Sequence, residues 1–478
     1  MQSARFYIIS HVQLRMDGFQ GFSCFRRDLF YHTCRIRLCI LYYQRTDISV
    51  SARGGCVRIF AGLVLYFPFE RFQSGVHRIS GTLCHSTYKS EESIMNITVV
   101  CDVLGEANNG TTIAAMNLIN SLKSKGHKVN ILCPDAEKKG FEGYYVVPTI
   151  NVGPLNGYVA KNGVRIAKRD DSVILDAIKD ADIVHVMTPF FLGRRAAYLA
   201  KQAGIPVSGG FHAMAENLTS HLFMKNFKAV NRLTYKYYSG LYKQCDAIHY
   251  PTQFLRDLYE KMYGPTNGYV ISNGVNSMFR PTEAVKPPEY KDRFVIISTG
   301  RYSKEKTQTT LIDAIALSKH SGKIQLILAG SGPLEDVLKK RAERLEVKPV
   351  FSFFPHEEMV SILNYADLYV HPAEIEAEGI ACLEAISCGL VPLISDSPRC
   401  ATKAYALDSS NTFKYKSPED LAAKIDWWLE HPEEKKARSL EYVSYAAGQF
   451  DQGMCMDKME KMLTETVENA EKRRCGKE

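Results

Sequence analysis

The sequence predicts an α/β protein with two Rossmann-like domains that face each other across a cleft. Its 478 residues exceed what one ordinary hydrophobic core holds, which favours two domains. From Met95 onward, short apolar runs alternate with segments of helical spacing, a pattern typical of parallel sheets. Three prolines interrupt the alternation at residues 279–291, and the pattern then resumes. We therefore expect one domain at 95–279 and the other at 285–448.

Residues 1–94 differ from the rest of the chain. They carry 12 Lys/Arg and 6 Asp/Glu, so most of the formal net charge of +8 lies there and the remainder is nearly neutral. They show no sustained helical or strand period, and their apolar run at 59–69 is too short to span a bilayer. We expect translation to start at Met95, with 1–94 as upstream sequence. A genuine, poorly ordered extension is the alternative.

The first domain opens with a strand at 97–100, followed by a polar loop and a helix. The apolar residues of this helix recur every three positions from Ile113 to Leu122. Later strands are predicted at 129–132, 183–186, 206–208, 247–250 and 268–271. Gly110 lies where the first helix begins, and helix amides at that edge of a sheet can bind a ligand. A simple helix cap explains this glycine equally well.

The second domain repeats the alternation. Strands are predicted at 294–298, 325–329, 368–370 and 391–394, and helices at 310–319, 334–345 and 421–429. The 13 cysteines of the whole chain include no Cys-x-x-Cys pair and no metal-ligand spacing. This distribution suits reduced thiols in the cytoplasm.

The most informative feature is a pair of carboxylates, Glu376 and Glu384, separated by seven residues. Their context predicts a strand, a polar loop that holds Glu376, a short helix that holds Glu384, and another strand. Two acceptor-only groups at this sheet edge can hold the hydroxyls of a sugar and a ribose. The amides of Gly379 and Ile380, at the start of the helix, can bind sugar hydroxyls or phosphate in the same space.

A pair of carboxylates can also belong to the active site of a glycosidase. Such an enzyme needs its acid and base carboxylates roughly 5–9.5 Å apart. Eight positions along a helix correspond to about 12 Å, which disfavours hydrolysis, although the loop blurs this figure and leaves hydrolysis open. A solvated acidic loop without a binding role is the remaining alternative.

Arg301 and Lys306 supply positive charge at the same edge, because residues 300–306 directly follow the first strand of the second domain. Arg301 offers a planar fork and Lys306 a point charge for a diphosphate. Two fixed cations can stabilise the negative charge that develops on a nucleotide as it leaves a sugar. The chain shows no convincing Asp-x-Asp motif in such a loop, so we expect no metal. A basic surface loop is the alternative.

In combination, these motifs resemble the retaining nucleotide-sugar glycosyltransferases of family 4, which adopt the GT-B fold. The resemblance covers about 95–465 and rests on the following: Gly300-Arg301 with Lys306, Gly330-Ser-Gly-Pro333, Glu376 spaced to Glu384, and Ile271–Val275 with Phe279 and Pro281. It implies transfer of a sugar from a nucleotide donor with retention of configuration and without a cofactor. It also implies that a C-terminal helix, at about 449–470, crosses back onto the first domain.

The resemblance implies a role for each matching residue of the second domain. Arg301 and Lys306 would hold the diphosphate, Glu384 the ribose hydroxyls and Glu376 a hydroxyl of the donor sugar. The chain departs from the family's pattern at Glu378, where the family commonly has Phe before the glycine. The packing of the sugar, and hence the choice of sugar, stays open at this position.

In the first domain, the resemblance assigns His212 as a polar contact to the reacting sugar across the cleft. A hydrogen-bonded structural histidine is the alternative. Glu216, four residues later, is a weaker candidate for binding the acceptor.

A basic, aromatic segment without any acidic residue lies between Asn217 and Asp246. Its cations are Lys225, Lys228, Arg232, Lys236 and Lys243, and its aromatics are Phe223, Phe227, Tyr235, Tyr237, Tyr238 and Tyr242. Such a composition predicts a helix on an anionic membrane surface, with about 1 kcal/mol from each basic residue. The alternative is an exposed helix whose aromatics pack on their own domain. We do not expect nucleic acid as a partner, because the rest of the chain shows no recognisable reader motif.

Residues 374–384, 211–217 and 406–408 resemble a subgroup that glucosylates or galactosylates diacylglycerol. This closer resemblance implies transfer of a hexose from a UDP-sugar, UDP-glucose before UDP-galactose, to a lipid hydroxyl. It implies a cytoplasmic enzyme bound peripherally to the inner face of a membrane. Two different functions compete with this one: transfer to a carrier-linked surface polysaccharide, and nucleotide-sugar binding without activity.

Overall fold

The computed structural model describes residues 94–102, 110–150, 153, 167–221 and 224–476, and the backbone of three short strands before residue 66. The chain divides into two units, Met1–Lys89 and Ser90–Glu478. In the first unit, β1 (Ala52–Arg53), β2 (Cys56–Ile59) and β3 (Leu63–Leu65) form an antiparallel sheet. Apart from these strands, the predicted upstream segment 1–94 lies outside the described residues, save Ile94.

A seven-stranded parallel sheet organises the first domain of the second unit, in the order β10-β9-β8-β7-β4-β5-β6. Its strands are β4 (Asn96–Val100), β5 (Lys128–Cys133), β6 (Tyr144–Val146), β7 (Ile183–Val186), β8 (Val207–Gly210), β9 (Ala247–Tyr250) and β10 (Gly268–Val270). The strand order reverses between β4 and β7, and doubly wound sheets bind ligands at such a switch point.

Six α-helices join these strands in the part of the first domain that the structure describes. They are α4 (Gly110–Ser124), α6 (Asp171–Ile178), α7 (Phe191–Gln202), α8 (Ala215–His221), α9 (Lys228–Tyr242) and α10 (Gln253–Tyr263), with the 3-10 turn η1 (Ala136–Lys138). Helix α7 begins beside the buried Asp102, whose carboxylate accepts hydrogen bonds from the amides of Leu192 (3.0 Å) and Gly193 (3.1 Å). Burial nevertheless raises the pKa of Asp102 to about 6.

A six-stranded parallel sheet organises the second domain, in the order β13-β12-β11-β14-β16-β18. Its strands are β11 (Phe294–Thr299), β12 (Ile324–Ala329), β13 (Val350–Ser352), β14 (Leu368–His371), β16 (Pro392–Ser395) and β18 (Thr412–Phe413), and β15 (Ile375–Glu376) pairs separately with β17 (Arg399–Cys400). The strand order reverses between β11 and β14. The two sheets therefore have the doubly wound, Rossmann-like topology that the alternation predicted.

The helices of the second domain are α11 (Gln308–Leu317), α12 (Glu335–Ala342), α13 (His356–Tyr365), α14 (Ile380–Ser387), α15 (Pro418–Glu430) and α16 (Pro432–Ala447). Short 3-10 turns are η3 (Pro288–Tyr290), η4 (Lys304–Lys306), η5 (Ser321–Lys323), η6 (Ala401–Tyr405) and η7 (Ser409–Asn411). The apolar faces of the α-helices cover a core of fully buried strand residues such as Ile296, Leu326 and Leu393.

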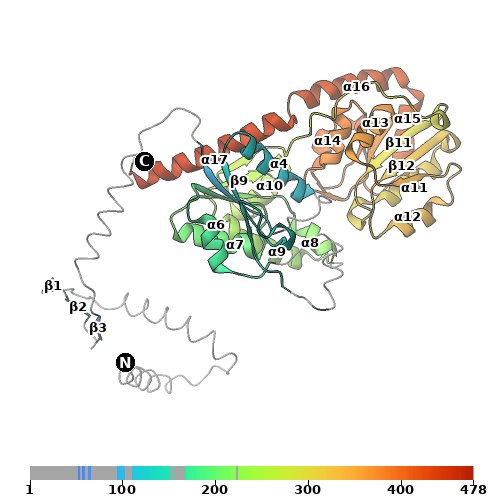
Figure 1. Ribbon diagram of the computed structural model, residues 1–478. Helices are drawn as coiled ribbons and strands as arrows, with labels where there is room; N and C mark the ends of the chain where they lie inside the picture. Colours follow the sequence, from blue (N-terminus) through green and yellow to red (C-terminus); the bar gives the residue numbers. More distant parts are fainter. Residues whose placement is uncertain are drawn as a thin grey trace, which may run out of the picture. The chain divides into compact units, whose positions relative to one another are not determined.

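The last helix, α17 (Gln452–Arg474), packs against α4 and the sheet of the first domain (Figure 1). Met459 and Met462 are buried in the same apolar cluster as Ile97. Glu460 adds polar contacts, because it pairs with Lys125 at 2.5 Å and with His127 at 2.7 Å. The chain thus returns from the second domain and completes the core of the first.

We predict that Met462→Ala destabilises the first domain by about 2–5 kcal/mol, because truncation of a buried methionine removes apolar burial and leaves a cavity. Met454→Ala is the matched control, since Met454 lies on the same helix and is 38% exposed. Urea unfolding followed by circular dichroism measures both variants. Equal effects of the two substitutions would contradict the packing of α17 on the first sheet.

Candidate functional site

The loops that follow β11 and β14 bring the predicted site residues of the second domain together. These strands are neighbours at the point where the sheet order reverses. Arg301 lies half-buried directly after β11, Lys306 ends the turn η4, and Glu376 lies in β15 after β14. The sheet edge at which α/β proteins bind ligands therefore carries two cations and a carboxylate.

Two glycines let the loop after β11 lie against the loop after β12. A Cβ atom on Gly330 would lie 2.1 Å from the carbonyl oxygen of Gly300, and one on Gly332 would lie 2.7 Å from that of Tyr302. The two loops are joined by hydrogen bonds from the Gly300 amide to the Ala329 carbonyl and from the Tyr302 amide to the Ser331 carbonyl, both 2.9 Å. This close approach fixes the backbone on either side of Arg301.

Lys306 and Glu376 form an ion pair with little exposure to solvent, their side chains being 22% and 15% exposed. Burial alone would raise the pKa of Glu376, but the charge of Lys306 and a contact with His371 outweigh it and hold the pKa at about 2. Burial would lower the pKa of Lys306, and Glu376 raises it above its ordinary value instead. Both groups are therefore charged over the whole physiological pH range.

Three polar side chains of β11 and β14 form a row of contacts that ends at Glu376. These residues were not identified in the sequence analysis. The Nε2 atom of His371 lies 3.4 Å from Glu376, and its Nδ1 atom lies 3.4 Å from the hydroxyl of Tyr369. Thr299 lies 2.9 Å from the same hydroxyl. Tyr369 and His371 occupy alternate positions on β14, so their side chains lie on one face of the strand, and this alternation was the available signal. Thr299 and His371 each lie one residue beyond the strands that the sequence predicted.

The carboxylate of Glu384, on α14, makes no hydrogen bond or ion pair with the residues that the structure describes, whereas its backbone carbonyl accepts a hydrogen bond from the Cys388 amide at 3.1 Å. Burial raises its pKa to about 7. Burial also raises the pKa of Tyr369 well above its ordinary value, and the charges of Glu384 and Glu376 add to this effect. A largely desolvated carboxylate with a raised pKa is stabilised most by a ligand that donates hydrogen bonds to it.

Gly379 allows α14 to begin next to Glu376. Its φ of 83° is left-handed, and a Cβ atom would lie 2.2 Å from the side chain of Thr402 and 3.2 Å from that of Glu376. The first amides of a helix lack intrahelical partners. Those of Gly379 and Ile380 accordingly lie where the sequence predicted a binding role for them.

The structure connects Glu378 with the segment that joins the two domains. Its buried carboxylate accepts hydrogen bonds from the hydroxyl of Ser272 (2.7 Å), the amide of Asn273 (2.9 Å) and the side-chain amide of Asn273. Burial raises the pKa of Glu378 to about 7, although these donors oppose the effect. The residue at which the chain departs from the family's pattern thus forms an interdomain contact.

His212 lies after β8 in the first domain, and its Nε2 atom is buried without a hydrogen-bond partner among the described residues. Its ring centroid is 5.1 Å from that of His249. Burial lowers the pKa of His212 far below its ordinary value, and the nearby His249 and His185 lower it further. A neutral imidazole with one unused nitrogen can exchange a hydrogen bond with a sugar hydroxyl.

Two further candidates of the first domain have less distinctive surroundings. Gly110 is the first residue of α4, and a Cβ atom there would meet no atom of the described residues within 4 Å. Glu216 accepts a 2.6 Å hydrogen bond from the hydroxyl of Tyr235. This bond gives Glu216 a structural partner within its own domain.

Helix α9 turns its basic residues outward and its tyrosines inward. Lys228, Arg232, Leu233 and Lys236 are exposed, whereas Tyr235, Tyr238 and Tyr242 are buried. The tyrosines therefore pack on their own domain, and Phe223 lies outside the described residues. Leu233 of the same helix is 68% exposed and Phe227, directly before the helix, 59%. Phe191 of α7 is 55% exposed, and its ring centroid lies 5.9 Å from that of Tyr237 on α9. We call Phe191, Phe227, Lys228, Arg232, Leu233 and Lys236 the α9 face.

Lys225 does not lie on an exposed basic face, where the sequence analysis placed it. Its ammonium group is 2.7 Å from the carboxylate of Glu374 in the second domain, and its side chain is only 19% exposed. A paired, largely buried lysine offers little charge to a membrane, so we do not count it in the α9 face. No helix in the described part of the chain is both long and apolar enough to cross a membrane.

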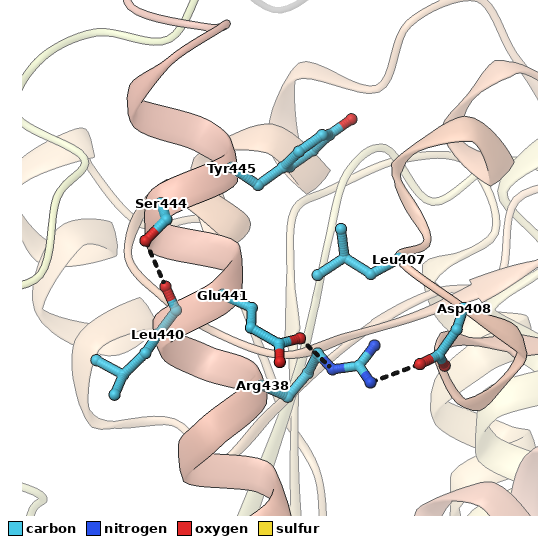
Figure 2. A pocket seen from close by; sticks show the side chains of 7 residues that line it. All are labelled: Leu407, Asp408, Arg438, Leu440, Glu441, Ser444 and Tyr445. Carbon is cyan, nitrogen blue, oxygen red and sulfur yellow. Dashed lines mark hydrogen bonds and ion pairs between the residues drawn. The ribbon is translucent and has the colours of Figure 1, made fainter.

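A surface pocket of 850 Å³ lies away from these residues, on α16 (Figure 2). Its wall contains Arg438, which Figure 2 shows between Asp408 and Glu441, at 2.5 Å and 3.0 Å respectively. The hydrogen bond from Arg438 is the main reason why the pKa of Asp408 falls to about 2. Asp408 also caps the turn η7. These bonds hold the loop that contains Asp408 against α16, so Asp408 has a structural role.

No group of three or more His, Cys, Asp or Glu side chains suited to a metal ion occurs among the residues that the structure describes. The expectation of a metal-free reaction stays a prediction.

Comparison with known families identifies the class of protein. The model described as "Glycosyl transferases group 1" matches residues 279–445, and the model described as "Glycosyltransferase Family 4" matches residues 108–278. The matches meet at the boundary between the two domains. The chain belongs to these GT-B glycosyltransferases, as its motifs predicted.

Several relatives act on lipids according to their names. The alpha-monoglucosyldiacylglycerol synthase of Streptococcus pneumoniae is 23% identical over 321 residues, 64% of this chain and 72% of that protein. Its namesake from Acholeplasma laidlawii is 23% identical over 349 residues, 68% and 85% of the two chains. A GDP-mannose:cellobiosyl-diphosphopolyprenol alpha-mannosyltransferase of Xanthomonas oryzae pv. oryzae is 27% identical over 239 residues, 47% and 58%.

Solved structures add to the comparison. The catalytic domain of cholesterol-alpha-glucosyltransferase from Helicobacter pylori is 48% identical, covering 32% of this chain and 98% of that one, with a TM-score of 0.32. Anabaena Alr3699/HepE in complex with UDP-glucose is 16% identical, covering 78% and 100%, with a TM-score of 0.59. The latter likeness supports the GT-B fold.

We predict that binding of UDP-glucose releases a proton near pH 7 through Glu384. Ribose hydroxyls that donate to the carboxylate lower its raised pKa, so affinity falls as the pH drops below about 7. Loss of a charged hydrogen bond in Glu384→Gln weakens binding by roughly one to two decades and abolishes the proton release. Calorimetry in buffers of different ionisation enthalpy measures both effects.

Glu378→Gln is the matched control, because Glu378 has a similarly raised pKa but contacts the interdomain segment. This variant should keep the proton release. If Glu384→Gln keeps it as well, Glu384 does not bind the donor.

Proposed function

We propose that this glycosyltransferase moves a hexose from a UDP-sugar to a lipid hydroxyl of the diacylglycerol type, with retention of configuration. The observation that carries the proposal is the largely buried Lys306–Glu376 ion pair at the switch point of the second sheet, together with Glu384 on the following helix α14, whose carboxylate has no partner among the residues that the structure describes. A nucleotide-sugar carries the complementary groups: a diphosphate for the cations, and ribose and sugar hydroxyls for the carboxylates.

In the proposed reaction, Arg301 and Lys306 hold the diphosphate and stabilise the charge that develops on it as the bond to the sugar breaks. Glu376 accepts a hydrogen bond from a sugar hydroxyl, and Glu384 accepts those of the ribose. His212 contacts the reacting sugar from the first domain. The acceptor's hydroxyl oxygen forms the new glycosidic bond to the sugar while the bond from the sugar to the β-phosphate breaks. The hydroxyl proton passes to a phosphate oxygen of the departing UDP.

Support for a lipid acceptor comes from the α9 face and from the relatives. Exposed apolar side chains beside exposed cations are the composition of a surface that lies on anionic lipid. Two relatives are named as synthases of a glucosyldiacylglycerol. A peripheral enzyme of this kind takes a soluble donor from water and a lipid hydroxyl from the bilayer.

The test is a transfer assay with the full chain and anionic vesicles that contain diacylglycerol. UDP-glucose, UDP-galactose and GDP-mannose are supplied separately, since one relative is named for GDP-mannose. We expect a monohexosyl-diacylglycerol in mass spectra with UDP-glucose. Product formed only with sterol or ceramide vesicles would show that the acceptor is another lipid. Product formed only with GDP-mannose would contradict a UDP-sugar as the donor.

We predict that replacing Lys228, Arg232 and Lys236 by Gln weakens binding to anionic vesicles by about two decades, at about 1 kcal/mol per cation. A triple Gln variant of the exposed Lys261, Lys340 and Lys436 is the matched control, because it removes the same charge elsewhere. Vesicle co-sedimentation measures both. Equal losses in the two variants would show a non-specific charge effect and contradict a membrane role for the α9 face.

A further inference from the structure

The strand that carries Glu376 belongs to the second domain but packs against the first. Ile375 is buried in the apolar cluster of the first domain, and Ala377 packs against the same cluster. The hydroxyl of Thr252, at the start of α10, donates a 3.1 Å hydrogen bond to the carbonyl of Ala377. The position of Glu376 therefore depends on how this strand is held between the two domains.

Glu374, two residues before Glu376, is the most heavily bonded group of this segment. Its carboxylate is 1% exposed and pairs with Lys225 of the first domain at 2.7 Å and with Arg399 of the second. Burial alone would raise its pKa, but Lys225 and Arg399 outweigh burial and lower it. Arg399 also donates to the backbone carbonyl of Lys225 (3.4 Å) and to the side chain of Asn226 (3.3 Å).

The backbone of Glu374 connects this cluster directly with the candidate donor site. Its amide donates a 2.7 Å hydrogen bond to the carbonyl of Glu305, the residue before Lys306. Its carbonyl accepts a 2.6 Å hydrogen bond from Ser397. A shift of Glu374 would therefore move Glu376 through the chain and Lys306 through the Glu305 contact.

We propose that Lys225, Glu374 and Arg399 form an interdomain clamp that positions Glu376 and Lys306 for the β-phosphate and sugar of the donor. The clamp residues are positioning residues and do not touch the donor. The proposal rests on the function proposed above for Glu376 and Lys306. The clamp accounts for why a lysine of the basic segment turns away from solvent and towards the second domain.

The clamp has a consequence that distinguishes it from a purely structural contact. UDP-glucose requires both Lys306 and Glu376, whereas UMP lacks the β-phosphate and the sugar and depends on the uridine end of the site. Loss of the clamp should weaken UDP-glucose binding and leave UMP binding unchanged. A contact that merely stabilises the fold would change the melting temperature without this selectivity.

The experiment is a double-mutant cycle on the full chain, with Lys225→Met, Glu374→Gln and the double variant, measured by calorimetric titration of UDP-glucose and UMP. We expect each single variant to raise the Kd of UDP-glucose roughly tenfold, and the double variant to add little further, because the two residues share one interaction. The Kd of UMP should stay within about twofold of the wild type. Lys225→Arg should restore UDP-glucose binding, because it keeps the charge.

Lys261→Met is the matched control, since Lys261 is an exposed lysine of the same domain. Melting temperatures identify any variant that fails to fold, and Lys225→Met alone then carries the comparison, because Glu374 keeps Arg399 as a partner. An unchanged Kd of UDP-glucose in Lys225→Met, additive effects in the cycle, or an equal loss of UMP binding would each overturn the clamp. A wild type that binds neither nucleotide would overturn the proposed function, and the clamp with it.

Discussion

The buried ion pair between Lys306 and Glu376 is the interaction on which the rest of the site depends. Removing either charge from water is costly, and removing one partner alone leaves the other charge buried and uncompensated. The pair is consequently built into rigid surroundings: the loop before Lys306 is held by the close approach of Gly330, and Glu376 by strand β15 and His371. The ends of two parallel strands supply both partners.

In the proposed function, the same ion pair determines how the nucleotide-sugar binds. A diphosphate brings negative charge into a region where Glu376 is already ionised, since its pKa is about 2. Lys306 alone cannot neutralise both, so the site needs a second cation. Arg301, on the same loop, has the geometry for phosphate. Glu376 is then free to act as a hydrogen-bond acceptor for the sugar while it stays within reach of Lys306.

Local sequence patterns predicted most strands of the two sheets but missed the short outer strands β6, β13 and β18. Glu376, Glu384 and Lys306 stand out because each lies at a predicted junction between a strand and a helix, and the junctions of parallel strands converge. The partners across the domains could not be read in this way. Lys225 and Glu374 are 149 positions apart, and Asn273 and Glu378 are 105 apart, so only the folded chain brings them together. The tyrosines of α9 were ambiguous because an amphipathic helix shows the same composition whichever face is buried.

Three glutamates at alternate positions show how strongly surroundings decide function in this fold. Among the residues that the structure describes, Glu374 has three cationic partners, Lys225, Arg399 and, at 3.8 Å, Lys416. Glu376 has one lysine and a histidine, and Glu378 has only neutral donors there. Burial acts to raise the pKa of each of these carboxyl groups. Neighbouring charges outweigh burial at Glu374 and Glu376 and lower their pKa values, whereas the pKa of Glu378 stays raised, at about 7. The outer two therefore hold the neighbouring segments by different chemistry, Glu374 through ion pairs and Glu378 through neutral hydrogen bonds. Glu376 is fixed between them, so the acidic sequence joins the two domains and contributes to the proposed donor site.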